Sequence, residues 1–402
     1  GAAARAGGEP IPWADPELKA ALGALGALPG AEEVLADLGC EYLVASFLAT
    51  NGLKPDQALE ALRQTADWRR TSGATAARQR FMTKLPDFKD FPHALHILQH
   101  MPMHEGLDAV DRRGLPFAVR CMGMADVVGL FGKLTEGDML EWQVCVSEMR
   151  LLRVEAYARK TGRLGEVTLL QDMTCPEGLI TKWRRNHAKM GIMRKVTTMM
   201  DMNYPGLLGP VILTNAPWAV HAILQVLRPL LPARISQKIE AVPEFQTVER
   251  LRELIESSRL PKFLGGEVED EEFVPGRVAA AGPVDGGTEL YIAAGRCEER
   301  GIFLSKGDIA AYGFNVAGTS SQDVNFGCRF EPDGASPSGA LEVRAAERVK
   351  EATGGSYVAP GRGRLVLAFD NSYSWVMPKT VRYECSLLPP EVASVANGAP
   401  GN

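Results

Sequence analysis

Two unbroken apolar runs constrain the fold of this chain more than any other feature. EVTLLQDM at residues 166–173 and GPVILTNAP at residues 209–217 lack the apolar and polar alternation of a strand with one solvated face. Such runs are typical of parallel strands that are covered on both faces. Helical patterns separate them, and KIEAV at residues 238–242 follows as a short third strand. The sequence therefore predicts an α/β layer with parallel strands.

Helices are predicted on both sides of these strands. The first is expected to run through EEVLADLGCEYLVASFLAT, residues 32–50, and the second from after the Asn51-Gly52 break to residue 70. LPFAVRCMG, residues 115–123, is strand-like. The remaining predicted helices span residues 138–160, 178–203, 218–231 and 244–258.

The pattern changes after LPKFLGG, residues 260–266. Pro261 ends the preceding helix and Gly265-Gly266 permit backbone angles closed to other residues, so the α/β unit is expected to stop here. An acidic, then Pro- and Gly-containing segment indicates a linker, and short strands between turn residues predict a separate all-β sandwich. The expected divisions are a mobile tail at 1–30, a helical subdomain at 31–84, the α/β unit at 85–266, the linker at 267–287, the sandwich at 288–390 and a tail at 391–402.

Composition excludes several classes of protein. A formal net charge of -5 with 44 basic residues argues against a nucleic-acid partner, which would need a concentrated basic face. Seven cysteines without a CxxC pair predict reduced thiols, as in the cytoplasm. GAAARAGGEP lacks the apolar core of a signal peptide, and no apolar run approaches the roughly 20 residues of a membrane span.

The motifs of common enzymes fail when tested against their spacing. FGKLTEG lacks the upstream glycine and the following Ser or Thr of a phosphate-binding loop. No GxGxxG follows a strand and no GxSxG is present. Asp172 ends a strand, where α/β enzymes place catalytic groups, but without a paired base a turn-capping role is the better interpretation. We therefore predict no catalytic residue and no enzyme activity.

Four histidines recur at helix-like spacing, at positions 93, 96, 100 and 104. This spacing suits either a metal-binding face or a row of histidines at the surface or the edge of a core. Pro102 breaks the helix and no carboxylate in the sequence nearby completes a site, so no metal is predicted.

Two apolar segments permit two interpretations. Methionines gather between Ala188 and Met202, and the helix from Trp218 to Leu231 is apolar around much of its circumference. Both features suit an ordinary core, and both suit the wall of a pocket for an apolar guest, since thioethers are flexible.

The order of these motifs resembles that of the CRAL-TRIO lipid-binding and lipid-transfer family. The similarity covers about residues 31–266 and rests on FLATNGLKPDQALEALRQTADWRR, EVTLLQDM, NYPGLLGPVILTNAPWAVHAILQVLRPLLPARISQKI and LPKFLGG. The segment from GDIAAYGFNV to LAFDNSYSWVMPKTVRYECSLL resembles a GOLD β-sandwich, with DNSYS its most specific part. The tandem arrangement is similar to that of supernatant-protein-factor and tocopherol-associated-like proteins and of patellins.

The resemblance implies a carrier that holds a lipid in a gated apolar cavity and moves or presents it between membranes. The helix from Trp218 would be the lid, with hinges near residues 215–217 and 231–232. The alternative is a non-transferring, lipid-sensing adaptor that tethers proteins at a membrane through the GOLD domain. The implied ligand is a phospholipid, a sterol-like or a tocopherol-like lipid, with no other cofactor.

Several head-group positions depart from the family pattern. Gly206 stands where phosphatidylinositol-transfer members have glutamate, and Ile235 occupies the position of the head-group threonine. Val167 and Leu169 replace the small hydroxylated pair used for phosphatidylcholine. A charged head would be buried with few partners, so we expect a lipid with a small or neutral polar end. The expected lining residues are Leu169, Met190, Met193, Met199, Trp218, Ile223, Leu227 and, by the family match, Lys238, for which a structural surface role is the alternative.

A basic cluster predicts where the protein meets an anionic membrane surface. It spans residues 182–195, with a solvated helix face as an equally supported alternative. Its members are the expected docking residues Lys182, Arg184, Arg185 and Lys189, together with Arg194 and Lys195. We expect a cytoplasmic protein with salt-sensitive peripheral membrane association and a protein partner on the GOLD domain.

Overall fold

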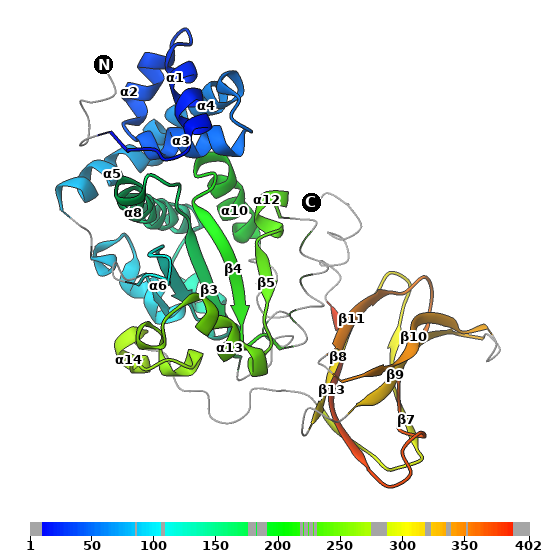
Figure 1. Ribbon diagram of the computed structural model, residues 1–402. Coiled ribbons are helices and arrows are strands. Elements are labelled where there is room, and N and C mark those ends of the chain that lie inside the picture. The colour runs from blue at the N-terminus through cyan, green and yellow to red at the C-terminus, as the bar shows by residue number, and fades with distance from the viewer. Residues whose placement is uncertain are drawn as a thin grey trace.

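The computed structural model describes residues 10–84, 87–105, 109–175, 182, 191–217, 220, 224, 228, 231–274, 288–317, 323–334, 339–350 and 353–388. Its first part is a helical cap on a mostly parallel sheet, and its second part is built of two antiparallel sheets (Figure 1). Both parts of the predicted fold class are therefore confirmed.

The N-terminal helices begin earlier than the sequence analysis expected. They are α1 (Pro16–Gly26), α2 (Ala31–Leu38), α3 (Glu41–Thr50), α4 (Pro55–Ser72) and α5 (Ala74–Thr83). The prediction of a mobile tail through residue 30 is wrong for α1, because Asp15 caps this helix and Leu18 and Leu25 are buried in the core. The single helix predicted over residues 32–50 is also wrong, since Gly39 adopts a φ of 55° that ends α2.

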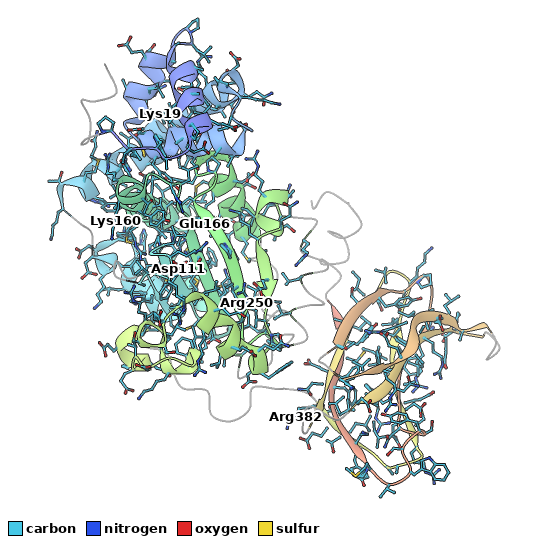
Figure 2. All side chains as sticks on the ribbon, viewed as in Figure 1. Lys19, Asp111, Lys160, Glu166, Arg250 and Arg382 are labelled. Carbon is cyan, nitrogen blue, oxygen red and sulfur yellow. The ribbon has the colours of Figure 1, made fainter. Side chains whose placement is uncertain are left out.

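The central sheet has the strand order β1-β2-β3-β4-β5, and its side chains fill the space up to the surrounding helices (Figure 2). The β1–β2 pair is antiparallel and the other pairs are parallel. The strands are β1 (Met103–His104), β2 (Phe117–Arg120), β3 (Val167–Asp172), β4 (Leu208–Thr214) and β5 (Ile239–Ala241). The helices of this part are α6 (Ala94–His100), α7 (Val127–Leu130), α8 (Glu136–Thr161), α10 (Gly191–Asn203), α12 (Ala233–Ser236), α13 (Glu244–Leu254) and α14 (Asp270–Phe273). Single 3-10 turns lie at Phe88–Asp90, Met122–Met124, Ser257–Arg259 and Lys262–Leu264.

The side chains on the two faces of the sheet belong to two separate apolar cores. Leu169 on β3 packs into a cluster with the N-terminal helices, whereas Leu170 belongs to a second cluster with Leu251 of α13. On β4, Val211 and Ile212 divide in the same way. Because neighbouring side chains of a strand point to opposite faces, a strand buried on both sides needs an unbroken apolar run.

LPKFLGG closes the α/β unit, but the packed chain continues beyond it. A Cβ on Gly266 would lie 2.0 Å from the carbonyl oxygen of Leu260, so only glycine fits this tight turn. The linker was expected to begin at residue 267, yet Phe273 and Val274 are buried in the second core. The Phe273 ring also stacks on His104 with 4.0 Å between ring centroids. The packed unit therefore extends at least to Val274.

The second part has its own core. Its sheets have the strand orders β10-β9-β12-β7 and β11-β8-β13-β6, with antiparallel pairing. The strands are β6 (Thr288–Ile292), β7 (Cys297–Leu304), β8 (Ile309–Ala317), β9 (Val324–Pro332), β10 (Leu341–Val349), β11 (Thr353–Val358), β12 (Gly363–Asp370) and β13 (Lys379–Leu388). Phe314, Phe326 and Phe369 pack together at its centre, in a cluster that contains no described residue before Leu290.

Candidate functional site

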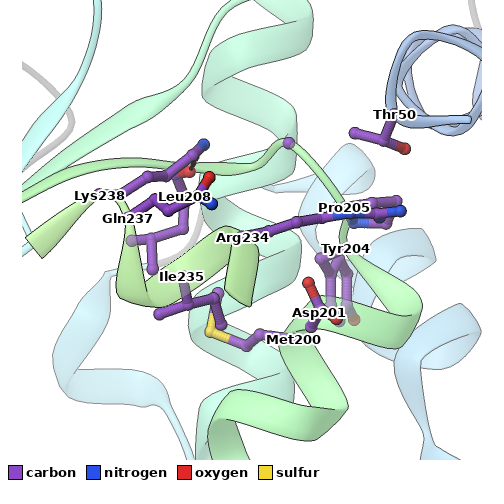
Figure 3. A pocket seen from close by; sticks show the side chains of 11 residues that line it. Thr50, Met200, Asp201, Tyr204, Pro205, Leu208, Arg234, Ile235, Gln237 and Lys238 are labelled. Carbon is purple, nitrogen blue, oxygen red and sulfur yellow. Dashed lines mark hydrogen bonds between the residues drawn. The ribbon is translucent and has the colours of Figure 1, made fainter. Parts of the chain in front are cut away.

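A pocket of about 330 Å³ opens between α10, α12 and the start of β4 (Figure 3). This volume lies at the lower end of the range for small-molecule sites. Figure 3 shows Arg234 extending from α12 across the pocket toward Tyr204 and Pro205. The lining residues are Thr50, Met200, Asp201, Tyr204, Pro205, Gly206, Leu208, Arg234, Ile235, Gln237 and Lys238.

One wall of the pocket is the turn that joins α10 to β4. Its Gly206 has a φ of 75°, a left-handed conformation that costs side-chain-bearing residues free energy. The hydroxyl of Ser46 on α3 donates to the carbonyl oxygen of Pro205, and a Cβ on Gly206 would lie 2.6 Å from that hydroxyl. Backbone conformation and close packing therefore both exclude the glutamate that the family resemblance would place here.

The same turn is anchored by a buried ion pair. The hydroxyl of Tyr204 donates to Oε1 of Glu148 at 2.6 Å. Arg69 donates to both carboxylate oxygens of Glu148, at 2.6 and 3.0 Å, and neither charged side chain is more than 2% exposed. Burial, and then the Glu148 carboxylate, raise the pKa of Tyr204 well above its ordinary value. The phenol therefore stays protonated and holds the pocket wall to α8 and α4.

The pocket has a net positive lining. Arg234 is exposed and makes no ion pair with any residue that the structure describes. Lys238 donates to the carbonyl oxygen of Leu208 and lies 3.5 Å from a carboxylate oxygen of Glu166, which is labelled in Figure 2. Asp201 is the acidic residue of the lining. Arg234 is thus available to an anionic guest, whereas Lys238 is held at the rim by protein groups.

Replacing Gly206 with alanine is expected to lower the free energy of unfolding by roughly 2–3 kcal/mol, from backbone strain and the clash with Ser46. Gly52→Ala is the matched control, since Gly52 has a φ of 64° but no atom beyond its chain neighbours lies within 4 Å of the position that a Cβ would take there. That control should cost only about 1 kcal/mol. Urea unfolding measures both, and equal losses would contradict the steric contribution of Ser46.

Of the eight expected lining residues, Lys238 lines the pocket described above, and the other seven fall into three groups. Leu169 is buried, and Met199 packs against the same cluster as Leu169, on the face that also holds Val220 and Leu224 of the expected lid. Met193 is 38% exposed, so the structure does not bring it into that cluster. Four further expected residues lie outside the described part of the chain: Met190, Trp218, Ile223 and Leu227.

The predicted membrane-docking cluster is wrong at Lys182. This side chain is buried and donates to the carbonyl oxygen of Gly123 at 2.6 Å, so it cannot meet a membrane surface as placed. Arg184, Arg185 and Lys189 lie outside the described residues.

Asp172 has the structural role that the sequence favoured. Its Oδ1 accepts hydrogen bonds from the backbone and hydroxyl of Thr174, at 3.2 and 2.7 Å, and from the side chain of Asn215 at 2.9 Å. It therefore caps the turn after β3 and ties it to the end of β4.

The four histidines do not form one face: His96 and His100 lie together, with 4.5 Å between ring centroids, and two of the four, His93 and His100, meet carboxylates. The sequence offered no carboxylate to complete a metal site, but in the structure His93 lies with Asp138 and Glu141 in a group whose ligand atoms are all within 4.8 Å. The sequence does not indicate this group, because the two acids lie on α8, more than forty residues after His93. His96 and His100 instead contact the carbonyl oxygen of Leu130 and the carboxylate of Asp126.

Sequence reasoning missed Thr50, Asp201 and Arg234 as site residues. Arg234 stands four residues before Lys238, which places it about one helical turn away, and this spacing was the available signal. Nothing in the sequence links Thr50 to the other two, because only the fold brings α3 to this turn.

Comparisons with known proteins identify a domain within the chain. Residues 104–266 match the family model described as the CRAL/TRIO domain. Patellin-6 of Arabidopsis thaliana is 22% identical over 344 residues, which cover 83% of this chain and 76% of that protein. Phosphatidylinositol/phosphatidylcholine transfer protein SFH12 and Patellin-4, both of Arabidopsis thaliana, are 22% and 23% identical over 58% and 69% of this chain, but over only 41% and 47% of their own lengths.

A solved structure is also similar. The one titled "Crystal structure of Sfh5" aligns with a TM-score of 0.45 and 10% identity, covering 67% of this chain and 94% of that one. Among the described residues, no helix combines the length and apolar character that crossing a membrane requires.

Proposed function

Because residues 104–266 match the CRAL/TRIO domain, we propose that this chain binds a phospholipid and carries it between membranes. The observation that carries the proposal is the pocket lined by Arg234, whose guanidinium forms no ion pair within the described part of the chain. The pocket shares Tyr204 and Leu208 with a large apolar cluster. A phospholipid presents this same combination of an anionic phosphate and apolar chains.

The cost of exposing lipid chains to water explains why a carrier needs an enclosed site. Each exposed methylene costs about 0.8 kcal/mol, so a two-chain lipid of some thirty methylenes costs on the order of 20 kcal/mol. Leu169, Val211, Leu213, Val220 and Leu224 meet in one buried cluster. In the proposed function, the segment that carries Val220 and Leu224 moves away from the sheet and the lipid chains take its place.

Asn215 is the proposed hinge of that movement. It has a φ of 50°, which is uncommon for a residue other than glycine, and stands directly after β4. Its backbone N–H donates to the hydroxyl of Thr247 at 2.9 Å and its side chain to Asp172. These bonds hold the near end of the moving segment while the residues beyond it change position.

The proposed head-group contact is a phosphate on the guanidinium of Arg234. Arginine suits this role because its planar fork matches a phosphate with two hydrogen bonds. Gly206 and Ile235 offer no side-chain polar group for an inositol ring, so the contact is to the phosphate that phospholipids share. A lipid with a neutral polar end, the expectation from the sequence, is the competing outcome.

The test is lipid transfer between vesicles together with native mass spectrometry of the purified chain. Arg234→Gln should reduce phospholipid transfer about tenfold, since a hydrogen bond to a charged group contributes about 1.5–3 kcal/mol. Arg252→Gln on α13 is the matched control, because this arginine is exposed and lies outside the pocket lining. Lys238→Gln should have a smaller effect than Arg234→Gln, since protein groups already satisfy Lys238.

Two results would contradict the proposal. Transfer that Arg234→Gln leaves unchanged would favour the neutral-ended ligand. A purified chain that carries no lipid and transfers none would favour the adaptor, in which the lipid-binding part only senses a membrane.

A further inference from the structure

We propose that the loop between β12 and β13 is a membrane anchor, which inserts Trp375, Val376 and Met377 into the interfacial layer of a phospholipid bilayer. These consecutive side chains are 95%, 80% and 58% exposed. Apolar surface leaves water favourably, and a contiguous exposed apolar patch marks an interaction site. The loop belongs to the β-sandwich, so the proposal goes beyond the lipid-carrier function of the preceding domain.

The loop is held in its exposed conformation by hydrogen bonds. Asn371 is fully buried, and its side chain donates to the carbonyl oxygens of Ile292 and Ala293 at 3.3 Å and of Met377 at 3.0 Å. The hydroxyl of Ser374 donates to the carbonyl oxygen of Met377 at 2.8 Å and accepts from its N–H at 3.2 Å. Both ends of the apolar segment are therefore fixed, and a fixed loop loses little conformational entropy when it inserts.

The surroundings of the apolar tip are polar and carry a small excess of positive charge. The guanidinium of Arg348 lies 4.0 Å from the ring centroid of Tyr373, and this arginine side chain is 57% exposed. Arg296 is exposed in the turn before β7, and its carbonyl oxygen accepts from the N–H of Asn371. Arg348 pairs with Asp323 at 2.9 Å, and Lys379 lies 3.6 Å from the same acid. Asp370 accepts from the N–H of Ser372 at the start of the loop. Together with Arg296 these residues carry one net positive charge. An apolar tip with positively charged residues beside it matches a bilayer, whose apolar interior lies beneath anionic head groups.

The size of the tip favours a bilayer over a protein partner. Even if each of the three side chains buried the roughly 150–250 Å² of an aromatic residue, together they would cover at most roughly 750 Å². A stable protein interface needs about 800 Å² on each partner, and its core must fit the partner's shape. Lipids rearrange around a protruding side chain and need no such fit. Tryptophan in particular is favoured at the membrane interface, where its ring lies at the level of the head groups.

Sedimentation of the whole 402-residue chain with phosphatidylcholine vesicles, with and without phosphatidylserine, tests this proposal. The combined Trp375→Ser, Val376→Ser and Met377→Ser variant should bind vesicles at least about tenfold more weakly, equivalent to about 1.4 kcal/mol. The matched control is Phe303→Ser with Val358→Ser, whose parent side chains are 73% and 46% exposed on strands of the sandwich. The control should bind as the wild type does. Equal binding by the loop variant, or no vesicle binding by the wild type, would overturn the proposal.

A second measurement reports the position of the side chain itself. Trp375→Phe keeps an apolar ring and should still bind, but it should lose the share of tryptophan fluorescence that lipids brominated on their acyl chains quench. Unchanged quenching would overturn the insertion of Trp375. Sedimentation velocity without lipid tests whether the loop instead binds a second copy of this chain. If the wild type forms a dimer and the loop variant does not, the loop is a dimer contact and the anchor proposal is wrong. Vesicle binding with no lipid transfer would contradict the carrier function and leave the anchor intact.

Discussion

Replacing Arg69 with methionine is expected to lower the free energy of unfolding by about 3–5 kcal/mol, the usual cost of removing one partner of a buried ion pair. Glu148 would lose its cationic partner in a site with no solvent exposure and would retain only the hydroxyl of Tyr204 as a hydrogen-bond donor among the described residues. Urea unfolding followed by tryptophan fluorescence measures the loss. Trp68 is a local reporter, since its ring meets Tyr204 edge-on at 5.7 Å.

The matched control is Arg63→Met on the same helix. Arg63 is 45% exposed and lies 3.7 Å from Glu60, so its replacement should change stability by no more than about 0.5 kcal/mol. A double variant, Arg69→Met with Glu148→Leu, should recover part of the loss because it removes the isolated charge. Equal effects of Arg69→Met and Arg63→Met would show that the pair does not anchor the pocket wall.

Replacing Phe326 with alanine is expected to destabilise the β-sandwich by about 3–5 kcal/mol and leave the α/β unit unchanged. The ring of Phe326 is fully buried and lies 4.5 Å from that of Phe314 and 5.2 Å from that of Phe369, between ring centroids. Differential scanning calorimetry should resolve two transitions, of which one moves. Two independent transitions are expected because, among the described residues, the sandwich core contains only residues from Leu290 onward.

Phe303→Ala serves as the control for this second prediction. Phe303 lies on β7 of the same sandwich but is 73% exposed, so its loss should leave both transitions nearly in place. A Phe326→Ala variant in which both transitions move together would show that the two parts unfold as one cooperative unit.

The sheet and the sandwich could be predicted from the sequence because the burial of a strand determines its local pattern of apolar residues. A strand covered on both faces must be apolar throughout, as β3 and β4 are, and an interrupted series of short strands marks a sandwich. The helix α1 has a weaker sequence pattern, because PELKAALGALG is rich in small residues. Its start could have been recognised from Asp15-Pro16, which is a helix-start signal. The two-residue strand β1 is too short to leave any pattern.

The site is less readable because its residues meet only in three dimensions. Thr50 and Arg234 are far apart in the chain and line one pocket. Lys182 shows the opposite error, since a lysine in a basic run suggests a solvated side chain, whereas here it is buried on a backbone carbonyl. Charge alone does not report whether a long side chain ends in water or on a protein oxygen.

The alternation of the central strands makes the two sides of one sheet respond differently to substitution. Ala118, Leu169, Val211 and Leu213 face the side proposed to receive lipid chains, while their immediate neighbours Leu170 and Ile212 face the other. Substitutions on the proposed lipid side can change the shape of a cavity. Leu170 and Ile212 meanwhile keep the strands packed against α13. The volume on the side proposed to receive lipid chains can therefore change one methyl group at a time while the other side of the same strands keeps its packing.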